Sequence, residues 1–85
     1  MKNATFRQLR VFNAVARHLS FAKAAETLHV SAPAITMQIK ELEAAVGMPL
    51  FERQGRKVSL TTSGEYMLVY ARKMLALLKD AEDAA

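Results

Sequence analysis

The chain has 85 residues, of which 52% are hydrophobic and 24% charged, a balance that predicts one small globular domain and excludes a disordered chain. It contains no cysteine, which excludes disulfide bonds and thiolate metal sites. No apolar run approaches the roughly 20 residues that span a bilayer, and the N-terminal residues lack the apolar segment of a signal peptide. We therefore expect a soluble cytoplasmic protein without a membrane partner.

The formal net charge is +4, and the positive side chains are unevenly distributed. Residues 1–40 carry six basic side chains and a single acid, Glu26, and residues 53–57 carry three bases and no acid. Three acids, Asp80, Glu82 and Asp83, lie close together near the C-terminal end. Such a distribution favours a polyanionic partner, although a basic surface that is merely solvated would have the same composition.

In chain order, the first helix is predicted over residues 5–18, with a cap at Asn3 or Thr5. Its apolar positions recur at helical spacing: Phe6, Leu9, Phe12, Val15, Ala16 and Leu19. Ser20 is expected to cap a second, short helix over residues 21–28. The inner face of that helix consists of Phe21, Ala24, Ala25 and Leu28. His29 and Val30 form the following turn, with Val30 pointing inward.

Ser31 is predicted to cap the third helix, with Pro33 in its first turn and Gly47 directly after its end at about Val46. Two short strands follow, at residues 50–53 and 57–61, with residues 54–56 as the hairpin tip. The spacing Thr62-Ser63-Gly64-Glu65 is typical of a capping box, so Thr61 or Thr62 begins a last helix that runs to about residue 82.

The third helix has one apolar stripe and one face free of acids. Ile35, Ile39, Leu42 and Val46 form the stripe that faces the core. Between Ser31 and Lys40 there is no acid, and the N-terminal end of the helix favours phosphate. These features predict a helix that reads the major groove of DNA, against the alternative that short polar residues only cap and solvate it. The predicted contacts of this recognition helix are Ser31, Ala32, Pro33, Thr36, Met37, Gln38 and Lys40.

The hairpin "ERQGRKV" places Arg53, Arg56 and Lys57 around Gly55. Arginine suits the narrow minor groove and its phosphates. Because this basic hairpin directly follows a helix-turn-helix, it is predicted to be a wing that contacts the adjacent groove. The expected fold is therefore mainly α: a winged helix-turn-helix of three helices and a two-stranded wing, followed by a long helix.

The last helix has an apolar arc that is too wide for one small domain to cover, which predicts a homodimer through this helix. The alternative is that part of the arc packs back on the first helix. A symmetric dimer suits a pseudo-palindromic operator. The predicted interface consists of Met67, Leu68, Tyr70, Ala71, Met74, Leu75 and Leu78.

Nothing in the sequence favours an enzyme. His18 and His29 lie eleven residues apart, at the ends of two helices, and neither has a carboxylate or nucleophile at a useful spacing. There is no glycine-rich phosphate loop. We expect no catalytic residue, no cofactor and no metal in this domain.

The segments "SFAKAAETLHVSAPAIT", "IKELEAAVGMPLFER" and "LTTSG" resemble, in order and spacing, the N-terminal DNA-binding domain of LysR-type transcriptional regulators. The segment "ITMQIKELE" is most similar to the corresponding segment of regulators of Calvin-cycle carbon dioxide fixation genes. The resemblance implies a winged helix-turn-helix over residues 1–61 and a dimerising linker helix over residues 62–85. It also implies a C-terminal effector-binding domain that this chain lacks, and full-length proteins that act as tetramers.

The resemblance also assigns roles to single residues. Pro33, Thr36 and Met37 match positions that touch bases or phosphates, with Ser31 and Gln38 beside them, and Arg53 and Arg56 match backbone and minor-groove contacts of the wing. Ala32 and Met37 depart from the family, because a glutamine and an arginine or serine are common there. The predicted function is sequence-specific binding of promoter DNA. The alternatives are a non-specific architectural DNA-binding protein and a winged-helix protein-interaction module.

Overall fold

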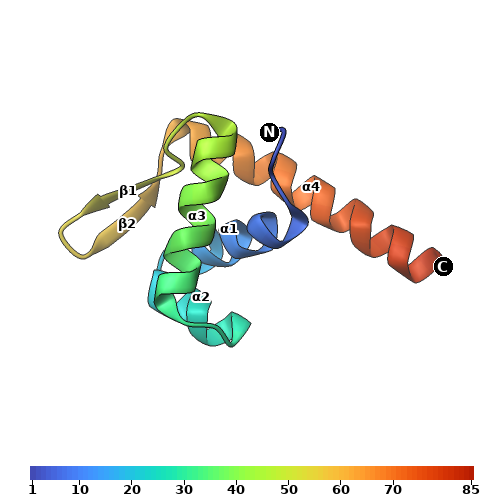
Figure 1. Ribbon diagram of the computed structural model, residues 1–85, viewed down its shortest axis with the longest axis horizontal. Helices are drawn as coiled ribbons and strands as arrows, with labels where there is room; N and C mark the ends of the chain where they lie inside the picture. The colour runs from blue at the N-terminus through green and yellow to red at the C-terminus, as the bar shows by residue number, and fades with distance from the viewer.

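The computed structural model describes residues 1–85, and it contains four helices and one two-stranded antiparallel sheet. The order is α1 (Phe6–His18), α2 (Phe21–Leu28), α3 (Ala32–Val46), β1 (Phe51–Gln54), β2 (Lys57–Leu60) and α4 (Thr62–Ala84). The first three helices pack together, the hairpin projects from one side, and α4 extends away on the other (Figure 1). This arrangement confirms the predicted winged helix-turn-helix with a long C-terminal helix. None of the four helices combines the length and apolarity that a membrane crossing requires.

Each helix begins at a hydroxyl cap whose oxygen accepts a hydrogen bond from a backbone amide three residues later. Thr5 accepts from Gln8, Ser20 from Lys23, Ser31 from Ala34 and Thr61 from Gly64, at 2.9–3.2 Å. A cap of this kind stabilises a helix by about 1 kcal/mol. The capping box predicted at Thr62–Glu65 was wrong, because Thr61 is the cap and Gly64 therefore takes the third helical position. A capping box does occur at Thr5 and Gln8.

Three helices end at residues in the left-handed conformation, Leu19 with φ 48°, His29 with φ 58° and Gly47 with φ 83°. Because Leu19 leaves the helix, its side chain does not follow the apolar stripe and is 46% exposed. Phe6, at the first position of α1, is also about half exposed. Val30 is 36% exposed in the turn between α2 and α3. The predicted inward placement of Val30 was therefore wrong.

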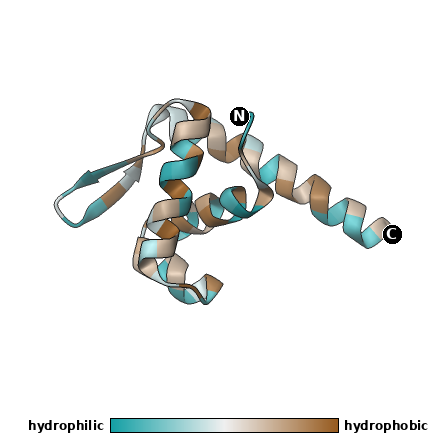
Figure 2. Cartoon of the chain, viewed as in Figure 1, coloured by the Kyte–Doolittle hydropathy of each residue, from teal (hydrophilic) through white to brown (hydrophobic).

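The core lies between α1, α2 and α3 and is closed by the start of β1 and by α4. Phe12, Val15, Ile35, Leu42 and Leu50 are its largest fully buried side chains. Hydropathy along the ribbon follows this pattern, with apolar positions recurring on each helix (Figure 2). Burial of one such side chain contributes about 1.5–3 kcal/mol.

The wing is a tight hairpin in which Gln54 pairs with Lys57, so Gly55 and Arg56 alone form the turn. Gly55 has φ 61°, which favours glycine at the first position of a two-residue hairpin turn. The predicted strands began one residue early at Leu50 and ended one residue late at Thr61, and Gln54, predicted in the tip, belongs to β1. Leu50 belongs to the core, and its amide donates to the carboxylate of Glu43 at 2.7 Å. Thr61 is the cap of α4.

Helix α4 packs against the core cluster as far as Leu75. Ala71 is fully buried, and Met67, Leu68, Met74 and Leu75 pack partly buried against the same core cluster. The prediction that Ala71 is a dimer contact was therefore wrong, because its own chain already covers this side chain. The large apolar side chains that remain exposed on this helix are Tyr66, Val69, Tyr70 and Leu77.

Candidate nucleic-acid interface

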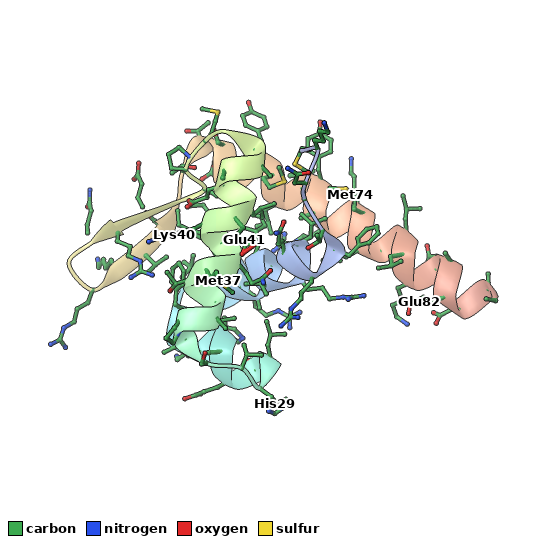
Figure 3. The ribbon with its side chains drawn as sticks, viewed as in Figure 1. His29, Met37, Lys40, Glu41, Met74 and Glu82 are labelled. Carbon is green, nitrogen blue, oxygen red and sulfur yellow. The ribbon has the colours of Figure 1, made fainter.

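The outer face of α3 is an open, shallow surface opposite the buried stripe. Ile35, Ile39 and Leu42 are buried, so the helix must turn its other residues outward. Met37 is 53% exposed, and in Figure 3 the sticks of Met37, Lys40 and Glu41 all come from the outer side of α3. The structure thus brings together most of the predicted recognition residues in one groove, lined by Ala32, Pro33, Thr36, Met37, Lys40, Glu41 and Ala44.

The N-terminal half of this face carries no negative charge. Ser31 caps the helix through its hydroxyl oxygen, and Pro33 lies in the first turn, where no hydrogen-bonding amide is lost. The first acid in α3 is Glu41, and α1 has no acid at all. The positive end of the helix dipole lies at the same place. This half of α3 is therefore suited to lie against a negatively charged DNA duplex.

The base of the wing is fixed to the helix-turn-helix by aromatic side chains. Phe51 of β1 packs against Phe12 and Phe21 with ring centroids 5.3 and 5.8 Å apart. The guanidinium of Arg53 lies 4.0 Å from the centre of the Phe21 ring. A cation–π contact of this kind contributes about 0.5–1 kcal/mol at an exposed site. Arg53 therefore lies beside α3, in a groove that it lines with Thr36 and Lys40.

Glu43 joins α3 to the start of the wing. Its carboxylate accepts a hydrogen bond from the amide of Leu50 at 2.7 Å and a longer one from Phe51 at 3.5 Å. Arg56 and Lys57 lie beyond this anchored base, and both are exposed and without an ion pair. The wing thus presents two free cations at its tip from a base that the core holds in place.

The other flank of α3 carries a feature that sequence reasoning missed. Ala34 and Gln38 line a groove there with Arg7 and Arg10 of α1. Gln38, predicted beside the reading face, therefore lies on this flank and is only half-buried. A possible signal was the pattern of α1, which has three arginines and no acid, but only the packing of α1 on α3 shows which of them come close to α3.

The two histidines are explained by local structure. The Nε2 atom of His18 lies 3.1 Å from the hydroxyl oxygen of Thr27, which donates to the carbonyl of Lys23 at 3.0 Å. His29 ends α2, where its backbone amide donates to Ala25 and Glu26. No group of three His, Cys, Asp or Glu side chains in the structure is placed to hold a metal ion.

Residues 6–65 match the model of the bacterial regulatory helix-turn-helix proteins of the LysR family. The chain belongs to the LysR family. It is also similar to the solved structure of the CbnR DNA-binding domain in complex with DNA, with a TM-score of 0.90 and 45% identity over 94% of this chain and 92% of that one.

Among curated relatives, the chain is 48% identical to the transcriptional regulator CfxR of Cupriavidus necator, over 98% of its length. It is 47% identical to a RuBisCO operon transcriptional regulator of Allochromatium vinosum over 95% of its length. It is 51% identical to the Hca operon transcriptional activator HcaR of Escherichia coli over 92% of its length. This LysR-family chain spans about a quarter of each relative, namely 26%, 27% and 25%.

Proposed function

We propose that this chain is the DNA-binding part of a bacterial transcriptional regulator, and that it binds promoter DNA sequence-specifically as a dimer. The observation that carries the proposal is the acid-free N-terminal half of the outer face of α3, flanked by a basic wing that is anchored to the same core. In the proposed complex, α3 enters the major groove, and Arg56 at the wing tip enters the adjacent minor groove. The similarity of this chain to a DNA-binding domain solved in complex with DNA supports the same function.

The regulated genes proposed here are those of carbon dioxide fixation. Support comes from relatives that are named as RuBisCO operon regulators. HcaR is similar to this chain at a comparable identity but is named for a different operon. The proposed pathway therefore rests on the names of the RuBisCO operon regulators and not on the DNA-binding residues.

The remaining parts of the proposal concern the longer protein. We infer a cytoplasmic regulator in which residues 1–61 bind DNA and residues 62–85 pair two subunits. A separate C-terminal domain binds a small-molecule effector and supports tetramers. The DNA-binding part itself uses no cofactor.

The proposal is tested by fluorescence anisotropy with two duplexes over a salt series. One duplex is selected from a random library by binding to the wild-type chain, and the other is a scrambled sequence of equal composition. A preference of several kcal/mol that persists as salt rises is expected for groove reading. Equal curves that collapse together would instead support an architectural protein, and no binding of either duplex would support a protein-interaction module.

The wing is tested by Arg56→Ala. Because the side chain is exposed and unpaired, its removal leaves the fold intact and is expected to weaken binding of the selected duplex by about 1–3 kcal/mol. Arg72→Ala, an equally exposed arginine on α4, serves as the matched control and is expected to change affinity little. Equal affinities of wild type and Arg56→Ala would remove the wing from the proposed complex.

A further inference from the structure

Arg7 and Arg10 of α1 line a groove beside the start of α3, and nothing in the proposed function uses them. The groove runs past the turn residue Val30 and past Ala34 and Gln38 of α3. Both arginine side chains are exposed. Neither is ion-paired, because the only salt bridge in the structure joins Lys79 to Asp83.

The groove lies along the side of α3 opposite the wing. Ala34 and Gln38 form one row along the helix, and Thr36 and Lys40 form another, with Met37 on the outer face between the two rows. The row with Thr36 and Lys40 borders the wing side, where Arg53 lies. The row with Ala34 and Gln38 borders the side of Arg7 and Arg10. Basic side chains therefore flank the N-terminal half of α3 on both sides.

The charges around the groove are almost all positive. Helix α1 carries no acid, and α3 has none before Glu41. The carboxylate of Glu41 lies on the same side, about one turn further along α3 from Gln38, where Gln8 donates to it at 3.4 Å. Two unpaired guanidiniums that face no carboxylate at close range favour an anionic partner.

We propose that Arg7 and Arg10 bind the phosphates of the DNA strand that borders the major groove on the side of α3 opposite the wing. A helix in a major groove about 12 Å wide has a phosphate backbone on each side. The wing side of α3 has Arg53 and the wing tip for one strand, and on the opposite side these two arginines line the groove along α3. Contacts of this kind position the protein without reading bases. The inference rests on the proposed function, since it requires α3 to enter the groove.

DNA is favoured over an acidic protein because the groove adjoins the N-terminal half of α3. Val30 directly precedes the cap residue Ser31, so a strand that borders α3 at its N-terminal end passes these arginines. An acidic peptide on the apolar floor of the groove is the competing occupant, and it would leave DNA affinity independent of Arg7 and Arg10.

The test is the double variant Arg7→Gln/Arg10→Gln, compared by anisotropy with wild type on the selected and the scrambled duplex. Affinity for both duplexes is expected to fall by about the same factor, roughly tenfold, with little change in their ratio. The slope of log K against log salt concentration is expected to shrink by about 2, about one for each lost phosphate contact. Arg7→Lys/Arg10→Lys keeps both charges and is expected to retain most of the slope.

The matched control is Arg72→Gln/Lys79→Gln, which removes the same charge from exposed positions on α4, where the helix extends away from α3 (Figure 1). The control is expected to keep most of the wild-type slope. If Arg7→Gln/Arg10→Gln matches this control in affinity and slope while Arg56→Ala still loses affinity, the phosphate contact is overturned and the proposed function stands. A loss confined to the selected duplex would also overturn it, since it would indicate base reading. Absence of binding by the wild-type chain would overturn the proposed function itself.

Discussion

Met37 is the large apolar side chain on the outer face of α3, and half of its surface is free. A thioether is only a weak hydrogen-bond acceptor and offers little to a guanine or adenine edge. It can pack against the C5-methyl group of thymine, the one apolar group that a base presents in the major groove. The same surface holds Ala32 and Pro33, which also lack hydrogen-bonding side chains. This part of α3 is therefore suited to thymine methyl groups.

We predict that replacing every thymine of the selected duplex by deoxyuracil lowers wild-type affinity about fivefold, roughly 1 kcal/mol, because only the methyl groups are lost. Met37→Ala should bind the thymine duplex more weakly and be less sensitive to the replacement. Lys40→Ala, on the same face, should keep the full sensitivity. Anisotropy titrations of all six combinations measure the coupling. An equal deoxyuracil effect in Met37→Ala and wild type would contradict the assignment.

Local chemistry made several single residues predictable. Ser20 and Ser31 precede apolar helical patterns, and each has the one hydroxyl that can satisfy the free amides of its helix. The cap of α4 was harder, because Thr61 and Thr62 are both competent. The choice depends on Pro49, whose carbonyl accepts the Thr61 hydroxyl at 2.7 Å across the chain. That contact has no signal in the local sequence.

At the scale of elements, the junction between α4 and the start of β1 is held by backbone contacts. The amide of Thr61 donates to the carbonyl of Leu50 at 3.1 Å. Gly64 lies in the first turn of α4 directly against that carbonyl, and a Cβ there would overlap the Leu50 oxygen and lie 3.0 Å from the Leu60 side chain. The glycine is therefore required by the close approach of α4 to the chain that leads into the wing.

Gly64→Ala is predicted to lower the free energy of unfolding by about 2–4 kcal/mol, as expected for overpacking against backbone. Helix propensity alone predicts the opposite sign, a gain of about 1 kcal/mol. The comparison is made by urea unfolding followed by circular dichroism. Gly47→Ala is the control, since Gly47 has φ 83° and open space around it, and should cost about 1 kcal/mol. A stabilised Gly64→Ala would show that the junction can open at little cost.

Helical periodicity predicted the helices of the core, because their apolar residues recur at helical spacing within single segments. Phe12, Ile35 and Leu42 are examples of these buried residues. The attachment of the wing was not predictable in this way. It depends on Phe21, Phe51 and Arg53, which come from two elements about thirty residues apart and meet only after the core forms. The groove lined by Arg7 and Arg10 could not be predicted for the same reason, since it exists only where α1 packs against α3.

At the scale of the whole molecule, α4 divides its apolar arc between the core and the solvent. Met67, Leu68, Met74 and Leu75 pack against the core, so part of the arc is covered by the chain itself, as the alternative reading of the sequence held. Tyr66, Tyr70 and Leu77 remain 67%, 58% and 67% exposed. These three lie along one side of the helix. An exposed apolar stripe of this kind favours a second copy of α4 as its cover.

We predict that the wild-type chain is a dimer at micromolar concentration and that Tyr70→Asp/Leu77→Asp is monomeric, because each chain would bury two aspartates in the paired stripe. Sedimentation equilibrium measures the association. Ala76→Asp adds a carboxylate at a neighbouring exposed position about 100° round the helix, outside the stripe, and should leave the dimer intact. On DNA, the monomeric variant should bind a single half-site as wild type does. It should bind a palindrome at least about tenfold more weakly, because the second half-site is no longer engaged intramolecularly. A wild-type chain that stays monomeric while preferring the palindrome would place the pairing of subunits outside α4.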